Sequence, residues 1–193
     1  RFLNIAAYPL LSNRRSWLFM DLPNAAGDNG LELFRYVNST DSKVQSYFVL
    51  DSDPEEDYDY YVGSRMHKIR RLFGCNKKSE QFLEIEKIGN VLAYRSIKHR
   101  LFALFSEFII TSHPDNTIIY PFWGNYPHLS GLMKSKTVFL QHGVTKDTVS
   151  EWLNQFDKPL AMLVTVSDRE KESFKDPTYG YSQDIVKTLG FPR

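Results

Sequence analysis

Short apolar runs, each ended by turn-favouring residues, recur along this chain of 193 residues and alternate with segments of helical spacing. Several runs lack a clean alternation of apolar and polar residues, which is typical of strands buried on both faces. The runs expected to be strands are Ser16–Asp21, Lys43–Asp51, Asn90–Tyr94, Phe108–Thr111, Thr137–Gln141 and Leu160–Val166. Strands that alternate with helices predict an α/β fold, a Rossmann-like parallel sheet flanked by helices.

The segments between these runs are expected to be mostly helical. Asp28 stands where an N-cap would, with apolar residues at helical spacing behind it. Ser167 is expected to cap a helix over 168–174, in which Glu170 completes a capping box. The other expected elements are a helix from Ser96 through about Ser106, a short extended piece at Thr117–Tyr120, one or two helical turns at Tyr126–Met133, and a last helix at Ser182–Leu189 with Gly190 as its C-cap.

The composition narrows the class of protein. The chain has 24 basic and 23 acidic residues, so its formal charge of +1 gives no overall field that attracts nucleic acid. The single cysteine, Cys75, excludes an internal disulfide and fits a reducing compartment. No apolar segment approaches the roughly 20 residues that a membrane-spanning helix needs. The basic stretch Arg65–Lys78 is either a solvated face or a surface that lies against anionic lipid.

The stretch Thr137–Thr148 holds the first candidate for a functional residue. His142 is expected just past the carboxyl end of a strand, and Gly143 leaves room for a ligand beside the imidazole. Ligands of open α/β sheets bind outside the carboxyl ends of the strands. His113 follows the strand at Phe108–Thr111 in the same way, so both histidines are expected to face one cleft. Taken alone, a histidine at a strand end is also typical of a hydrogen-bonded structural residue.

Asp28, Asn29 and Gly30 open the first expected helix. Free backbone N–H groups and the positive end of the helix dipole suit an anion at such a place. An aspartate there is equally a plain N-cap. Because an anionic Asp28 repels a phosphate that comes close, the position suits a polyol hydroxyl better.

Motifs of other chemistries are missing from the sequence. There is no Gly-x-Ser-x-Gly elbow, no P-loop and no Gly-x-Gly-x-x-Gly. One cysteine and dispersed histidines do not make a zinc site. The acidic run DSDPEEDYD lacks the Gly and Glu of a calcium loop. We therefore expect no metal.

Short motifs follow one another in a recognisable order from about residue 16 to the end of the chain. They are Trp17-Leu18-Phe19, Ala26-Gly27-Asp28-Asn29-Gly30, Leu33-Phe34-x-Tyr36, Ser96 after a strand, Ile109-Ile110-Thr111-Ser112-His113, Val138-Phe139-Leu140-Gln141-His142-Gly143-Val144-Thr145, and Tyr179-Gly180 to Gly190-Phe191-Pro192-Arg193. In this order they resemble the CDP-glycerol glycerophosphotransferase family, the synthases of teichoic acids and related capsule polymers. The Gln-His-Gly and Gly-Phe-Pro-Arg elements are the most specific.

The resemblance implies the amino-terminal, acceptor-side half of a two-domain glycosyltransferase-B fold. Residues 1–15 are then an upstream segment, residues 16–189 are the Rossmann-like acceptor-side domain, and residues 190–193 begin the crossover to a carboxyl-terminal domain that this chain does not contain. In the family the activated donor is held largely by that second domain. The chain alone is therefore expected to be inactive.

The implied reaction transfers glycerol phosphate, or another polyol phosphate, from a CDP-polyol donor to a hydroxyl of a lipid-linked or polymeric acceptor and releases CMP. His142 matches the family histidine proposed as general base. The residues expected to bind substrate are Asp28, Asn29, Gly30, His113 and Gly143. We expect no cofactor and no nucleic acid partner, and a peripheral location on the inner face of a bacterial membrane. The alternatives are a nucleotide-sugar glycosyltransferase of the same fold and a non-catalytic α/β binding module.

Overall fold

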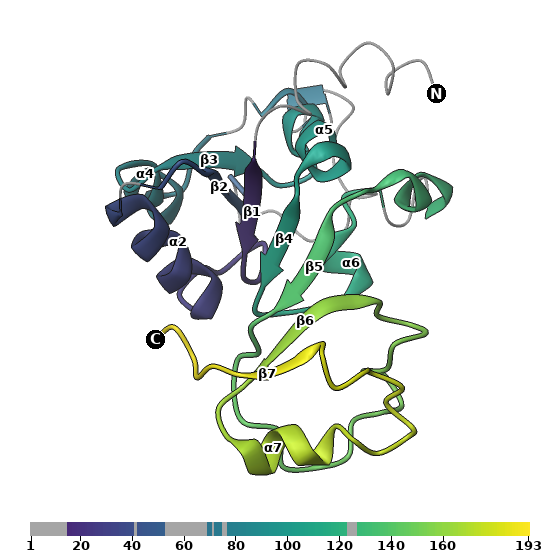
Figure 1. The fold of residues 1–193 in the computed structure, drawn as a ribbon. Helices are drawn as coiled ribbons and strands as arrows, with labels where there is room; N and C mark the ends of the chain where they lie inside the picture. Colours follow the sequence, from purple (N-terminus) through teal and green to yellow (C-terminus); the bar gives the residue numbers. More distant parts are fainter. Residues whose placement is uncertain (1–14, 41, 53–68, 71, 75–76, 123–126) are drawn as a thin grey trace.

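A computed structural model of the chain describes residues 15–40, 42–52, 69–70, 72–74, 77–122 and 127–193. Within these ranges seven strands form one parallel sheet in the order β3-β2-β1-β4-β5-β6-β7 (Figure 1). The strands are β1 Ser16–Met20, β2 Gln45–Leu50, β3 Asn90–Ala93, β4 Phe108–Thr111, β5 Lys136–Phe139, β6 Leu160–Thr165 and β7 Val186–Thr188. The Rossmann-like α/β fold expected from the sequence is confirmed. Residues 1–14 of the expected upstream segment, residues 53–59 of the acidic run and half of the basic stretch Arg65–Lys78 lie outside the described residues.

Helices cover both faces of the sheet. They are α2 Asn29–Ser39, α4 Glu80–Glu86, α5 Ile97–Phe105, α6 Asn116–Ile119 and α7 Asp168–Ser173, with a 3-10 helix at Pro127–Leu132. Neighbouring residues of one strand enter different core clusters, because side chains alternate between the two faces. Phe19 packs with Phe34 of α2, whereas Leu18 joins the cluster that holds Ala103 of α5. This two-sided burial explains why several strands lack a clean alternation of apolar and polar residues.

Two expected elements are wrong. Residues 182–189 form no helix; Val186–Thr188 is instead the edge strand β7. Leu163 in β6 donates its N–H to the carbonyl of Ile185, and Leu189 donates to the carbonyl of Thr165. The open edge of β6 thus supplies hydrogen bonds that outcompete a helix of this length, which is marginal by itself.

The extended piece expected at Thr117–Tyr120 is a helical turn, α6. Its backbone N–H groups at Ile118 and Tyr120 donate back to residues 115 and 116, and Ile118 and Ile119 pack into the core under β1 and β4. Packing of two adjacent isoleucines against one core overrides their preference for strands.

The caps of α5 and α7 form as expected, but the capping box is incomplete. Ser96 and Ser167 each accept a hydrogen bond from the third residue of their helix. Glu170 does not return to the N–H of Ser167; its carboxylate accepts from the backbone of Val166 and Thr145. Glu170 therefore joins α7 to the loop after β5.

The strand order reverses at β1, which lies between β2 and β4. The chain winds outward from β1 to β3, then crosses back to β4 on the other side. Such a reversal opens a crevice at the carboxyl ends of the two central strands. Among the helices that the structure describes, none has the length and apolarity needed to cross a membrane.

Candidate active site

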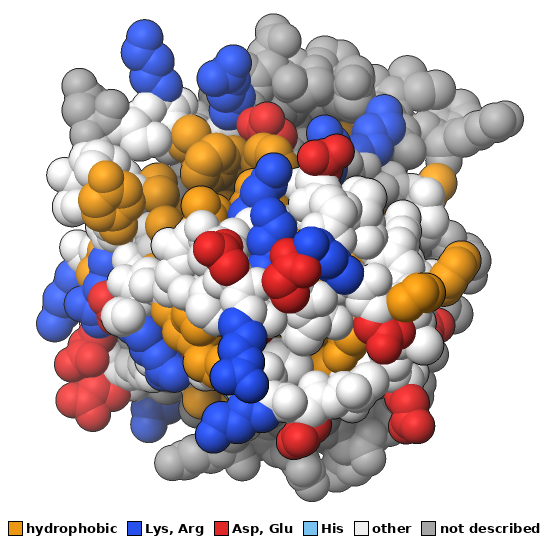
Figure 2. Space-filling view, turned by 60° about the horizontal axis from the view of Figure 1, so that its bottom comes forward, with side chains coloured by type: hydrophobic (Ala, Val, Ile, Leu, Met, Phe, Trp, Pro, Cys, Tyr) orange, Lys and Arg blue, Asp and Glu red, His pale blue; other side chains and the backbone are white. Residues whose placement is uncertain are grey.

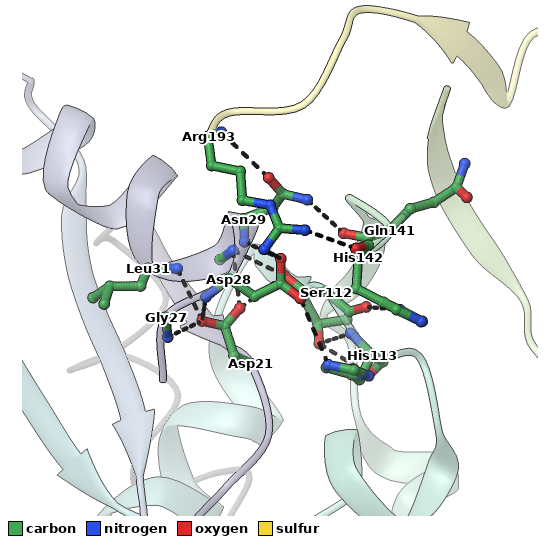
Figure 3. A network of polar contacts seen from close by, with 12 residues as sticks. Asp21, Gly27, Asp28, Asn29, Leu31, Ser112, His113, Gln141, His142 and Arg193 are labelled. Carbon is green, nitrogen blue, oxygen red and sulfur yellow. Dashed lines mark hydrogen bonds and ion pairs between the residues drawn. The ribbon is translucent and has the colours of Figure 1, made fainter. Parts of the chain in front are cut away.

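Three segments that leave the carboxyl ends of central strands meet in one polar network (Figure 3). Asp21 follows β1, Ser112 and His113 follow β4, and Gln141 and His142 follow β5. Because the strands are parallel and adjacent, these segments emerge at one edge of the sheet. The helix α2 begins beside them at Asn29.

Asp21 occupies the amino-terminal end of α2. Its buried carboxylate, 1% exposed, accepts hydrogen bonds from the backbone N–H groups of residues 27, 28, 30 and 31 at 2.9–3.3 Å. The remaining N–H, that of Asn29, donates to the N-cap side chain of Asp28. A negative charge at this end of a helix is stabilised by the helix dipole. The N–H groups at this helix end are therefore taken by the chain itself, and Asp28 is the N-cap that its position in the sequence suggests.

Gly30 is the point where β1, α2 and β4 approach one another. A Cβ at this position would lie 2.5 Å from Oδ1 of Asp21 and 2.7 Å from the carbonyl oxygen of Met20. Any larger residue would separate the helix from the strand. Ser112 completes the junction, because its hydroxyl donates to Asp21 at 2.7 Å and accepts from the N–H of Gly30 at 2.9 Å.

His142 is exposed, and the backbone sets the orientation of its ring. Its Nδ1 lies 3.2 Å from the carbonyl oxygen of Ser112. A carbonyl only accepts hydrogen bonds, so Nδ1 carries the proton in this contact. In the neutral ring the lone pair is then on Nε2. The arrangement holds a proton acceptor at the edge of the crevice.

His113 lies face to face with His142. The two ring centroids are 4.6 Å apart and the ring planes differ by 15°. Nε2 of His113 is 3.8 Å from Oδ2 of Asp28. Burial, and then the neighbouring His142, lower the pKa of His113 below its usual 6.5, against the opposing effect of Asp28. His113 is accordingly neutral at neutral pH.

Arg193 closes the network from the far end of the sequence. Its Nη1 is 3.3 Å from Oδ1 of Asp28, its Nη2 donates to the carbonyl of His142 at 3.0 Å, and its backbone N–H donates to Asn29. Asn29 is fully buried, and its amide in turn donates to the carbonyl of Gln141 at 2.8 Å. Arg193 and Asn29 therefore tie the start of α2 to the loop that carries His142.

The loop after β5 is anchored by Gln141. This residue has a left-handed backbone, with φ of 60°, and its side chain points away from the histidines (Figure 3). The side-chain amide donates to the carbonyl of Val164 at 2.6 Å and accepts from the hydroxyl of Thr145 at 2.9 Å. Glu170 accepts from the N–H of the same threonine at 2.8 Å. These bonds offset a conformation that costs a non-glycine residue about 1–2 kcal/mol.

The residues proposed from the sequence occupy three kinds of position. The side chains of Asp28, His113 and His142 come together at the crevice. Asn29 and Gly30 are buried behind Asp28. Gly143 is exposed, with open space where a Cβ would lie.

Four residues of the network escaped the sequence reasoning, namely Asp21, Ser112, Gln141 and Arg193. Each stood inside a quoted strand or motif, but its partners are too distant in sequence to be inferred. Across the described residues, no group of three or more His, Cys, Asp and Glu is placed to hold a metal ion.

The sequence of the chain is similar to that of one protein of known role. No family model matches the chain. It is 30% identical over 186 residues to the minor teichoic acid biosynthesis protein GgaB of Bacillus subtilis (strain 168). The alignment covers 96% of the chain and 18% of GgaB, so the chain spans about a fifth of that relative's length. This match confirms the resemblance that the motifs show to the CDP-glycerol glycerophosphotransferase family.

Proposed function

We propose that this chain is the acceptor-side domain of an enzyme that transfers glycerol phosphate, or another polyol phosphate, from a CDP-activated donor to a hydroxyl of a cell-wall or capsule polymer. The role of GgaB in teichoic acid biosynthesis supports polyol-phosphate transfer in general. The CDP-polyol donor, the release of CMP and the binding of the donor by a second domain are parts of the proposal.

One observation carries the proposal: the contact between Nδ1 of His142 and the carbonyl of Ser112. It fixes the tautomer that a general base requires, with the Nε2 lone pair free to accept a proton. The same contact holds the imidazole beside the end of β4, next to the strand-order reversal, and open α/β sheets bind their ligands at such a place.

In the proposed step, Nε2 of His142 takes the proton of the acceptor hydroxyl while the oxygen forms a bond to the phosphorus that carries the polyol. The bond from that phosphorus to the bridging oxygen of the diphosphate breaks, and CMP leaves with the electron pair. The protonated imidazole then releases its proton to solvent. General base catalysis of this kind is worth about 10²–10⁴ in rate.

The other predicted residues have two roles in the proposal. Asp28 and His113 line the crevice and orient acceptor hydroxyls, while Gly143 leaves room for the acceptor beside the base. Asn29 and Gly30, which are buried, hold Asp28 and the loop of His142 in place.

The acceptor is proposed to be lipid-linked or polymeric, and the protein to act in the bacterial cytoplasm, peripheral on the inner face of the membrane. Anionic lipid would meet the basic stretch Arg65–Lys78, of which a large part lies outside the described residues. Vesicles of phosphatidylglycerol should retain the full-length protein more strongly than vesicles of phosphatidylcholine, and more weakly as salt rises.

The test of the proposed base is His142→Ala in the natural full-length protein, assayed with CDP-glycerol and membrane acceptor. CMP release should fall about 10²–10⁴-fold, the range expected for the loss of a general base. Circular dichroism should be unchanged, because the side chain of His142 is exposed. Lys175→Ala, an exposed change beyond α7, is the matched control and should keep normal turnover.

Near-normal CMP release from His142→Ala would overturn the assignment. Parallel assays with CDP-ribitol, UDP-sugars and GDP-sugars identify the donor class. Turnover with a nucleotide sugar and none with a CDP-polyol would instead favour the glycosyltransferase alternative.

A further inference from the structure

A pocket of about 250 Å³ opens beside His142, between the loop after β5 and the segment that starts at Val149. His142 forms part of its wall, so the pocket adjoins the candidate base. Pockets that bury drug-sized ligands have volumes of roughly 300–1,000 Å³. This pocket therefore fits a single small unit, such as one sugar or polyol, better than a nucleotide.

Two residues that line the pocket, Leu153 and Trp152, are held by defined neighbours. Leu153 forms part of the floor and belongs, at 1% exposed, to the core cluster under β5, β6 and β7. The indole of Trp152 forms a wall and is 42% exposed, so part of its ring is open to a ligand. The Nζ of Lys158 lies 5.3 Å from the indole centroid and donates to Asp115 at 3.1 Å. A cation held in this way attracts the ring and fixes its orientation.

The rim of the pocket offers two charged groups on an anchored loop. Lys146 and Asp147 line the pocket and are exposed, and neither has a hydrogen bond or ion pair with another described residue. The preceding residue, Thr145, is held from both sides by Gln141 and Glu170. The backbone just before the two charges is therefore anchored, and their polar atoms are available to a ligand.

The chemistry of these three side chains favours a sugar ring. An indole gives a flat apolar surface that suits the C–H face of a pyranose, and a polyol chain has no such face. A carboxylate accepts two neighbouring hydroxyls, and an ammonium donates to another. Figure 2, which brings forward the face at the bottom of Figure 1, shows basic and acidic side chains interspersed among small hydrophobic groups.

We propose that the pocket is an acceptor subsite for one sugar ring, which stacks on Trp152 and places its hydroxyls on Asp147 and Lys146. The identity of the ligand as part of an acceptor rests on the proposed function. Since His142 lines the same pocket, a sugar bound there lies beside the base and positions the acceptor hydroxyl. The subsite would make the enzyme selective for sugar-containing acceptors.

The first test separates acceptor binding from donor binding in the full-length protein. Trp152→Ala should raise the KM for the acceptor about tenfold, as expected for the loss of one aromatic stacking partner, and leave the KM for CDP-glycerol within about twofold. Trp152→Phe, which keeps a flat ring, should recover most of the affinity. Phe156→Ala is the matched control, because Phe156 is 90% exposed, lies in the same segment and is not part of the pocket. An unchanged acceptor KM in Trp152→Ala, or an equal rise for both substrates, overturns the subsite.

The second test needs no turnover. Saturation-transfer NMR should detect binding of methyl glucoside, methyl galactoside or their N-acetylamino counterparts to the wild-type protein, and weaker binding to Trp152→Ala. Binding of sn-glycerol 3-phosphate alone, with the same dependence on Trp152, would overturn the sugar assignment. Because this readout is independent of the donor, a failure of phosphate transfer would leave the sugar-binding result standing, and the two proposals fail separately.

Discussion

At the scale of single residues, the candidate site depends on a backbone contact. The carbonyl of Ser112 orients the ring of His142, whereas many catalytic histidines are oriented by a carboxylate. A carbonyl carries no net charge, and no side-chain substitution removes it. The backbone at the end of β4 therefore sets the tautomer of His142.

His99 is a second histidine with a defined protonation state, and its role is structural. It is 1% exposed, and its Nδ1 accepts the backbone N–H of Arg95, which has a left-handed backbone. Burial, followed by the nearby charges of Arg100 and Arg95, lowers its pKa from 6.5 to about 3.

The low pKa of His99 predicts a loss of stability in mild acid. Below pH 6.5 His99 binds a proton in the unfolded chain but stays neutral in the folded chain. The contribution of His99 to stability is therefore complete above pH 6.5 and is lost as the pH falls toward 3. Between pH 7 and pH 5 the free energy of unfolding should fall by about 2 kcal/mol from this residue. Urea unfolding of the chain at both pH values measures the difference.

His99→Asn is the matching control for this prediction. The asparagine oxygen can accept the N–H of Arg95 but does not titrate. The variant should be less stable at pH 7 and should lose less stability between pH 7 and pH 5. Equal losses in the two proteins would show that other groups cause the acid sensitivity.

Position after a strand or at the start of a helix was enough to predict that the ionisable side chains of the candidate site lie close together. His142, His113 and Asp28 each follow a strand or open a helix, and parallel strands bring their ends together. Arg193 could not be found in this way. Its partner Asn29 lies 164 positions away, and only the tertiary fold brings the two together.

At the scale of elements, the start of α2 depends on a carboxylate from another element. Asp21→Ala would leave four backbone N–H groups without this acceptor, at a cost of about 3 kcal/mol or more. Asp28→Ala removes the N-cap of the same helix and should cost about 1 kcal/mol. Chemical denaturation of both variants gives the two free energies. Similar costs for the two would contradict a dominant role of Asp21.

The elements that the sequence predicted well are those with a strong local pattern. Phe108–Thr111 reads as a buried strand from its own residues and is one. β7 has only three residues, and the hydrogen bonds that define it come from β6. The residue pattern within 182–189 cannot show that β6 lies beside this segment. The same holds for α6, where packing of Ile118 and Ile119 decides the conformation.

At the scale of the whole molecule, the strand order makes the site, and composition and pattern do not specify that order. The expected parallel sheet is correct, but the placement of β1 between β2 and β4 is a property of long-range contacts. From this reversal follow both the crevice and the meeting of segments that begin at residues 21, 112 and 141. Fold class was therefore predictable from the sequence, while the neighbours of each loop were not.

Arg193→Gln tests whether the ion pair of Arg193 with Asp28 affects the protonation of His113. Loss of the guanidinium removes the cationic partner of the Asp28 carboxylate, and Asp28 is one of the charges that raise the pKa of His113. When His113 is protonated, the stacked pair of His113 and His142 is a poorer base. The acidic limb of the pH–rate profile of the full-length protein should therefore move to higher pH. Stability should change by less than about 1 kcal/mol, because the ion pair is half exposed on the arginine side.

Arg193→Lys keeps the positive charge but loses the forked contact with Asp28 and His142. Its pH–rate profile should resemble that of the wild-type enzyme more than that of Arg193→Gln. Identical profiles in all three proteins would show that Arg193 has no electrostatic effect on the site.

The carboxylate of Asp21 at the start of α2 also changes which ligands this edge of the sheet can bind. In nucleotide-binding relatives of the open α/β architecture, the corresponding helix end is the seat of a phosphate. Here the carboxylate of Asp21 already accepts the N–H groups at this helix end, so they are not available to a bound anion. The domain thus has the topology of a nucleotide-binding fold, but the start of α2 does not offer a phosphate-binding site. At this wall of the crevice, an uncharged hydroxyl-bearing molecule has the advantage over an anionic one before either reaches the imidazole.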